Sequence, residues 1–141
     1  GARLEANILS HLDFISGELE KIEARSPETV RLYRENLEAR IRELIEDTSV
    51  DENRLITETA IFADKVAVDE ETVRLRSHIS QLESMLESDS ATGKKLDFLI
   101  QEMNREANTI GSKSQNVEIA HTVVEIKAEI EKIREQIQNI E

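Results

Sequence analysis

Apolar residues recur every three or four positions along most of the chain, which is the spacing of one face of an α-helix. In the first stretch these positions are Leu4, Ile8, Leu12, Ile15, Leu19 and Ile22. The same spacing predicts helices over residues 1–25, 27–47, 51–66, 69–86, 94–109 and 114–140. Helices in this order predict an all-α fold, an antiparallel bundle of long helices, and we expect the first two to form a helical hairpin.

Short polar segments mark where these helices are expected to begin and end. Ser26-Pro27-Glu28 suits a helix start, because serine caps, proline fits the first helical position and an acid complements the helix dipole. Residues 48–51 form a short polar link before the helix that begins near Asp51, and Asp69 is a candidate N-cap for the helix after it. The stretch over 87–93 is the clearest loop, and Gly111-Ser112 predicts a break or a bend.

The last expected helix has a thin apolar stripe whose spacing drifts toward seven residues. Its members are Val117, Ala120, Val124, Ile126 or Ala128, Ile130, Ile133 and Ile137. Such a stripe is typical of a long helix that packs against a partner. Since long helices with thin stripes often complete their burial on another subunit, we expect inter-subunit packing.

The composition supports the helical class and excludes several kinds of protein. Glycine (4) and proline (1) are too scarce for the many turns of an all-β fold. No cysteine is present, which excludes disulfides, thiolate metal sites and a cysteine nucleophile. The chain has neither a signal peptide nor an apolar run of about 18 residues, so we expect a cytoplasmic protein with no membrane partner. The net charge of −12 argues against nucleic-acid binding by this chain alone.

The first of two segments with candidate chemistry covers residues 70–78. Glu71, Arg74 and His78 share one helix face, because they are spaced by three and four residues. A carboxylate, a guanidinium and an imidazole in a row suit metal binding, or phosphate binding with proton transfer. The spacing alone favours a plainer interpretation, in which Glu71 and Arg74 form an exposed ion pair and His78 is a surface residue.

The second segment covers residues 94–109. One flank of its apolar stripe is expected to hold Asp97, Gln101, Arg105 and Asn108, and the other Glu102, Glu106, Thr109 and Lys113. Asn104 and Asn108 are unusual, because asparagine is a poor helix former, and they indicate that their amides are used. The alternative is a hydrogen-bonded network at the end of the helix. His11 and His121 are expected to be ordinary surface or boundary residues.

The block from Gly93 to Ser114 closely resembles the signature of the bacterial YicC/YloC family. Three further segments are similar to other blocks of that family, namely Glu70-Glu71 with Arg74-Leu75 and His78, residues 22–28 with Tyr33-Arg34-Glu35, and residues 134–141. The resemblance covers essentially the whole chain, and the long block is highly specific.

This resemblance implies both an architecture and an activity. It implies that residues 1–141 are a single all-helical C-terminal domain of a longer protein whose N-terminal domain is absent. Family members are implied to be divalent-metal-dependent endoribonucleases that cleave single-stranded RNA, by hydrolysis or transesterification, and that assemble as hexamers. RNA and further copies of the chain are therefore the expected partners, and Mn²⁺ or Mg²⁺ is the expected cofactor. Basic surface on the other half would then offset the acidity of this one.

The resemblance also gives candidate roles to residues of the matching blocks. The catalytic residues are expected to be His78, Glu71, Arg74 and Arg105, with His78 as general acid, general base or metal ligand and the arginines on phosphate. The expected metal ligands, all of them oxygen donors as Mg²⁺ and Mn²⁺ prefer, are Glu70, Glu71, Asp97, Glu102 and Glu106. The expected RNA-binding residues are Lys94, Lys95, Gln101, Asn104, Asn108 and Lys113.

Two other functions remain open at this point. The chain is alternatively a non-catalytic helical scaffold that oligomerises and positions the N-terminal domain, in which case the polar segments form satisfied salt bridges with no open pocket. A third interpretation, an adaptor for a protein partner, rests only on the long amphipathic helices. The ribonuclease hypothesis requires the two polar segments to lie face to face.

Overall fold

The computed structural model describes residues 2–25, 29–46, 51–88 and 91–139. Within these ranges it contains the five helices α1 (Ala2–Ala24), α2 (Val30–Glu46), α3 (Glu52–Glu87), α4 (Gly93–Lys113) and α5 (Val117–Gln138). No strand occurs in the described residues, so the predicted all-α class is confirmed. The helix start predicted at Ser26-Pro27-Glu28 lies outside the described residues.

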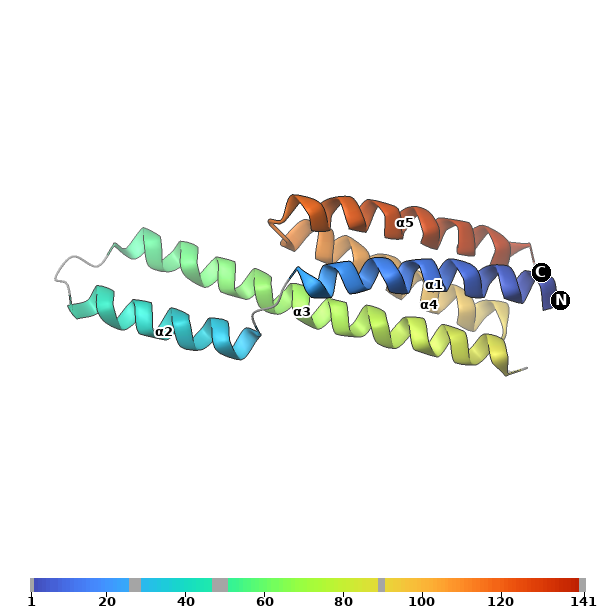
Figure 1. The fold of residues 1–141 in the computed structure, drawn as a ribbon, viewed down its shortest axis with the longest axis horizontal. Helices are drawn as coiled ribbons and strands as arrows, with labels where there is room; N and C mark the ends of the chain where they lie inside the picture. Colours follow the sequence, from blue (N-terminus) through green and yellow to red (C-terminus); the bar gives the residue numbers. More distant parts are fainter. Residues whose placement is uncertain (1, 26–28, 47–50, 89–90, 140–141) are drawn as a thin grey trace.

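Helices α1, α4, α5 and the second half of α3 form an antiparallel bundle, and α2 lies outside it (Figure 1). α3 has 36 residues, about 54 Å at 1.5 Å per residue, whereas α1 has only 23, so α3 extends beyond the bundle. α2 packs along this protruding part and contacts no other described helix. The helical hairpin is therefore formed by α2 and α3, and the predicted pairing of the first two helices is wrong.

The bundle is held by a continuous core of apolar side chains from all of its helices. The predicted stripe of α1, from Ile8 to Ile22, is fully buried, with no member more than 1% exposed. The other main contributors are Leu75, Ile79, Leu82, Leu96, Leu99, Ile100, Met103, Ala107, Ile110, Ile119, Val123, Ile126, Ile130, Ile133 and Ile137. Burial of each large side chain contributes roughly 1.5–3 kcal/mol. α2 has one buried residue, Leu37, and therefore contributes little to this core.

The break predicted before Asp69 does not occur, because α3 is continuous through this region. Asp69 does not cap a helix, and its carboxylate instead lies 3.9 Å from Lys65 Nζ, one turn earlier. Val68 and Thr72 on either side of it are buried. Packing against the bundle thus continues through a segment whose local residues suit a helix start, and tertiary contacts override the local signal.

The starts of α3, α4 and α5 follow from capping residues in the sequence. Asp51, Thr92 and Asn116 have an extended backbone, and each side chain accepts a hydrogen bond from a backbone N–H of the first turn. The predicted helix start near Asp51 is confirmed, whereas the capping role of Asp51 was not predicted. Each such cap typically stabilises a helix by about 1 kcal/mol.

The apolar stripe of α5 differs from the prediction over its first two turns. Val117 and Val124 are 69% and 66% exposed, whereas Ile119 and Val123 are each 4% exposed. The later part of the stripe is confirmed by the burial of Ile126, Ile130, Ile133 and Ile137. Because apolar residues occupy adjacent positions near the start of α5, periodicity alone did not decide which of them would face α4.

Gly111 lies inside α4, so the predicted break at this residue is wrong. A Cβ atom at Gly111 would lie 3.0 Å from Val123 Cγ1 and 3.6 Å from Val123 Cβ of α5. Gly111 therefore lies where two helices approach closely rather than at a bend.

We expect Gly111→Ala to destabilise the fold by about 1 kcal/mol. Overpacking costs roughly 1–3 kcal/mol and exceeds the roughly 1 kcal/mol that alanine gains in helix propensity. Gly17 is the matched control, because a Cβ there meets no atom within 4 Å, so Gly17→Ala should stabilise the fold. The midpoints of urea unfolding measure the stability of both variants. Equal shifts of the two midpoints in the same direction would contradict the close approach of α4 and α5 at Gly111.

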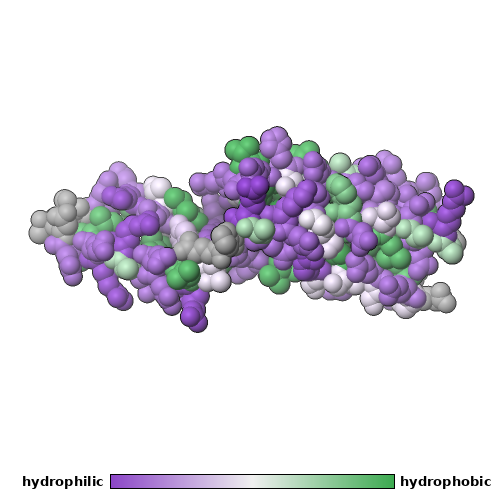
Figure 2. Space-filling model, in the orientation of Figure 1, coloured by the Kyte–Doolittle hydropathy of each residue, from purple (hydrophilic) through white to green (hydrophobic). Residues whose placement is uncertain are grey.

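The surface visible in Figure 2 is mainly hydrophilic, with apolar residues scattered over it. This agrees with a chain in which charged residues make up 34%. Among the described residues, no helix combines the length and the apolar character that crossing a membrane requires.

Candidate functional site

The two polar segments singled out from the sequence lie side by side, because α3 and α4 pack as antiparallel neighbours (Figure 1). Glu71 of α3 contacts Arg105 of α4, and His78 of α3 contacts Glu106 of α4. Seven residues, about two helical turns, separate Glu71 from His78, so both reach the same face. We refer to the following side chains as the charged network: Glu71, Arg74, His78, Glu102, Arg105 and Glu106.

Glu71 binds two arginines, although its own side chain is only 9% exposed. Arg74, one turn further along α3, donates from Nη1 to Glu71 Oε1 at 2.9 Å. Arg105 donates from Nη1 to Oε1 at 3.4 Å and from Nη2 to Oε2 at 3.2 Å. The contact with Glu71 raises the pKa of Arg105. This forked arrangement fixes the orientation of the Arg105 guanidinium as well as its charge.

Glu106 is a fully buried carboxyl group with a histidine beside it. His78 Nδ1 lies 2.8 Å from Oε1, with which it forms a hydrogen bond, and 2.7 Å from Oε2. Oε2 accepts no hydrogen bond from the described residues. Burial raises the pKa of Glu106, and the neighbouring His78 and Arg105 offset part of that shift. A carboxylate at Nδ1 favours the imidazole tautomer with its hydrogen on Nδ1, which leaves Nε2 to accept a proton.

Arg105 connects the two halves of the charged network. Its Nε lies 3.6 Å from a Glu102 oxygen, and its Nη2 lies 3.7 Å from Glu106 Oε2. The side chains of Arg105 and Arg74 are 47% and 54% exposed, and that of His78 is 19% exposed. Two guanidinium groups and an imidazole therefore reach solvent in one place, where they can bind an anion and transfer a proton.

The raised pKa of Glu106 predicts how stability depends on pH. The folded state holds this proton more tightly than the unfolded chain, in which the carboxyl titrates near 4.5. The contribution of Glu106 to stability is therefore present below pH 4.5 and is lost as the pH rises through the folded pKa. We expect Glu106→Gln to make the free energy of unfolding fall less steeply across that window, by at most about 1.4 kcal/mol per pH unit.

Urea unfolding at a series of pH values measures this slope. Glu102→Gln is the control, because it removes the same charge from the same helix at a side chain that is 32% exposed. If the slope is unchanged in Glu106→Gln, or changes equally in Glu102→Gln, the raised pKa of Glu106 is contradicted.

Several predicted metal ligands lie outside the charged network. Glu70 is exposed. Asp97 accepts a hydrogen bond from Gln101 at 2.9 Å, and its charge contributes to the raised pKa of Arg134 on α5. Asp97 and Gln101 of the predicted flank thus contact each other, whereas the side chain of Arg105, from the same flank, turns toward Glu71 of α3. The long side chain of Arg105 reaches across the interface between α4 and α3 to the carboxylate of Glu71.

The predicted RNA-binding residues are dispersed over α4. Lys94, Lys95, Gln101 and Asn108 are exposed and Asn104 is half-buried. Lys113 lies two turns beyond Glu106, and its Nζ is 3.8 Å from Asp64 Oδ1 of α3. The structure thus brings together the predicted catalytic residues, but it does not gather the predicted RNA-binding residues around them.

The described residues of one chain do not fit a metal centre. No group of three or more His, Asp or Glu side chains among them is arranged to hold a metal ion. Both oxygens of Glu71 face guanidinium groups, and Glu106 faces His78. Cationic neighbours of this kind occupy the carboxylates that a Mg²⁺ or Mn²⁺ ion would need.

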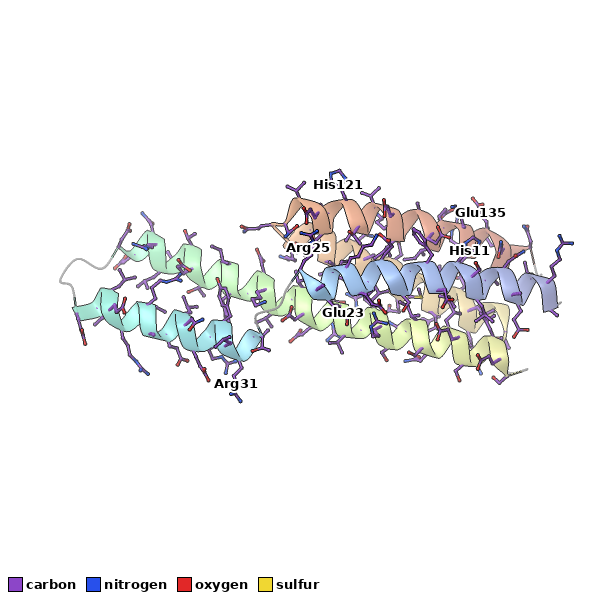
Figure 3. All side chains as sticks on the ribbon, viewed as in Figure 1. His11, Glu23, Arg25, Arg31, His121 and Glu135 are labelled. Carbon is purple, nitrogen blue, oxygen red and sulfur yellow. The ribbon has the colours of Figure 1, made fainter. Side chains whose placement is uncertain are left out.

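One contact was not anticipated from the sequence. His11 of α1 (labelled in Figure 3) hydrogen-bonds through Nδ1 to Glu129 of α5, and Gln136 lies 3.4 Å from its Nε2. His11 is a half-buried boundary residue with a carboxylate partner. Because 118 residues separate the two in the chain, no local spacing indicated this pair.

Comparison with known proteins identifies the family. Residues 22–141, which include the whole charged network, match the family described as "Endoribonuclease YicC-like, C-terminal". The chain belongs to this family. The resemblance inferred from the sequence blocks is thereby confirmed.

Two curated relatives carry the name "Probable endoribonuclease YicC". The protein of Clostridioides difficile (strain 630) is 54% identical over 142 residues, and that of Haemophilus influenzae is 38% identical over 141 residues. Both alignments cover 100% of this chain and 48% of the relative. The chain therefore spans about half the length of these YicC relatives.

Proposed function

We propose that this YicC-like chain supplies part of the active site of an endoribonuclease that cleaves single-stranded RNA. The observation that carries the proposal is the His78–Glu106 pair at 2.8 Å beside two partly exposed arginines. The names of the relatives support the reaction class. The charged network supplies the kinds of group that cleavage of a phosphodiester requires.

His78 is the proton-transfer group in this proposal. Glu106 orients the imidazole through Nδ1, so that Nε2 accepts a proton from the attacking hydroxyl, which is the 2′-hydroxyl of the RNA or a water molecule. The oxygen then attacks phosphorus, and the P–O bond to the leaving oxygen breaks as that oxygen takes up a proton from water. The burial of Glu106 keeps the pair rigid, because few alternative rotamers fit the core.

Arg74 and Arg105 bind the non-bridging phosphate oxygens in this proposal. Each guanidinium has five N–H donors, and contacts with carboxylates use only some of them. As negative charge grows on the phosphate oxygens, fixed cations at this distance stabilise the transition state. Glu71 holds both arginines in place, which makes it a positioning residue.

We also propose that the chain assembles with further copies of itself and that cleavage depends on Mn²⁺ or Mg²⁺. Both proposals rest on the family resemblance. The described residues of one chain do not bring three metal ligands together, so no step of the proposed reaction uses a metal ion. Ligands from the RNA or from another part of the assembly would have to complete such a centre. The hexamer is likewise proposed from the family resemblance.

The acidity of the chain is compatible with RNA cleavage only if cations lie locally where RNA binds. A net charge of −12 repels phosphate at long range. We propose that basic surface outside this chain attracts the RNA, and that Arg74 and Arg105 act on one phosphate at close range.

The alternative is a non-catalytic scaffold for oligomerisation. The Glu71–Arg105 pair is of a kind that a structural ion-pair network contains, but the names of the relatives favour the ribonuclease. The two functions differ in what His78 does, since a scaffold needs no proton acceptor at this position.

The deciding experiment measures cleavage of a single-stranded RNA by the protein that carries this chain, with His78 or Glu106 replaced. Loss of cleavage with intact folding and assembly supports the ribonuclease. Unchanged cleavage with the same assembly would leave the scaffold.

A further inference from the structure

A pocket of about 210 Å³ lies where the α2–α3 hairpin leaves the bundle. It is far larger than the roughly 10–15 Å³ that admits one water molecule. Arg25, at the end of α1, contributes to its wall beside the start of α5 (Figure 3). Neither the charged network nor the contacts described above use this pocket as a whole.

The lining is cationic in a strongly acidic chain. Among the described residues that line the pocket, three are cations, Arg25, Lys65 and Lys113, and one is a carboxylate, Asp64. Charged side chains of one sign around a concave surface attract ligands of the opposite sign. The pocket is therefore suited to an anion, although the chain as a whole has a net charge of −12.

Each of these cations has an ion-pair partner, and the pairs are weak enough for a phosphate to compete with them. Lys65 Nζ lies 3.9 Å from Asp69 Oδ2. Lys113 Nζ lies 3.8 Å from Asp64 Oδ1, which is beyond hydrogen-bond distance. Arg25 pairs with Glu118 of α5, and the two side chains are 51% and 58% exposed. Exposed pairs of this kind are worth little, typically up to about 1 kcal/mol, so a phosphate in the pocket can compete with them.

The uncharged part of the wall combines apolar and aromatic side chains with the polar residues Ser114, Gln115 and Asn116. Tyr33 of α2 and Ile119 of α5 line the pocket together with the cations. The Tyr33 ring stacks on Phe62 at 5.9 Å between centroids, which holds the ring in place. A phosphate with a flat, partly apolar group attached, such as a nucleotide, matches a wall of this composition.

We propose that this pocket is a binding subsite for one nucleotide of the RNA, with its phosphate between Arg25 and Lys113. The inference rests on the proposed function, since it takes the ligand to be the RNA strand. Lys113 lies seven residues beyond Glu106, about 10 Å along α4 at 1.5 Å per residue, on the side of α4 that contacts α3. A strand bound in the pocket can therefore continue to His78.

The test uses the protein that carries this chain and a short 2′-O-methylated oligonucleotide, which resists cleavage through a 2′-hydroxyl. We expect Lys113→Gln and Arg25→Gln each to weaken its binding about tenfold, because each removes a charge-assisted contact with phosphate. Asp64→Asn should strengthen binding, because it removes a carboxylate from the wall of the pocket. Lys127→Gln is the matched control, since Lys127 is exposed on α5 and does not line the pocket.

The same oligonucleotide with a 5′-phosphate or a 5′-hydroxyl identifies the source of the phosphate. Loss of affinity without the 5′-phosphate shows that the pocket holds a strand end, and equal affinity shows that it holds an internal phosphodiester. A folding control by circular dichroism accompanies each variant, and Asp64→Asn adds a gain of affinity that misfolding does not produce.

Binding and cleavage fail independently in this design. If the three pocket variants bind like Lys127→Gln, the subsite is overturned, whatever the cleavage rate. If His78→Ala cleaves RNA at the parent rate while the pocket variants change binding, the charged network loses its catalytic role and the subsite stands.

Discussion

His78→Ala is expected to lower the rate of RNA cleavage by about 10²–10⁴-fold, which is the usual contribution of a positioned general acid or base. The loss should appear in kcat, because His78 takes part in proton transfer, while the arginines still bind phosphate. Rates of cleavage of a single-stranded RNA at saturating substrate measure kcat, and rates at limiting substrate measure kcat/KM.

His121→Ala is the matched control, because His121 is an exposed histidine on α5, away from α3 (labelled in Figure 3). Glu106→Gln should reduce the rate less than His78→Ala, since it leaves the imidazole in place but removes the carboxylate that orients it. An equal rate for His78→Ala and His121→Ala would exclude the proposed proton transfer.

Leu75→Ala is expected to destabilise the fold by about 2–5 kcal/mol, which is the range for removing a large side chain from a packed core. Leu75 is 0% exposed and belongs to the core shared by α1, α3, α4 and α5. The cavity left behind would lie one turn from both Glu71 and His78, so cleavage should fall as well. The midpoint of urea unfolding measures the loss of stability.

Leu37→Ala is the corresponding change in the hairpin, and it should cost less than about 2 kcal/mol. Leu37 is 8% exposed, and α2 packs only against α3 among the described helices. Hydrogen exchange should show faster opening of α2 than of the bundle, because few buried contacts hold it. Equal destabilisation by the two substitutions would show that the hairpin is as firmly packed as the bundle.

The sequence by itself determined the helical class, the face of α1 and the family. Each of these depends on information that is local in the chain. The spacing from Ile8 to Ile22 needs only the helical period, and the block from Gly93 to Ser114 is read residue by residue.

The sequence predicted the breaks between helices less well, because a residue that suits a helix end can also lie inside a helix when tertiary contacts favour it. Asp69 suits a cap, yet α3 continues through it since Val68 and Thr72 are buried on the bundle. Gly111 suits a break, yet it lies inside α4 where Val123 of α5 approaches closely.

The candidate site shows the same division. The sequence identified His78 and Glu106 as chemically interesting, but only the packing of α3 on α4 placed Nδ1 at 2.8 Å from a fully buried carboxyl group. Packing also directed Arg105 to Glu71 and brought Arg25, Lys65 and Lys113 together with residues of α2 and α5 in one pocket. The helical period fixes which side chains share a face of a helix. Which other helix covers that face depends on contacts between residues far apart in the chain, and those contacts decide the partner of each charged side chain.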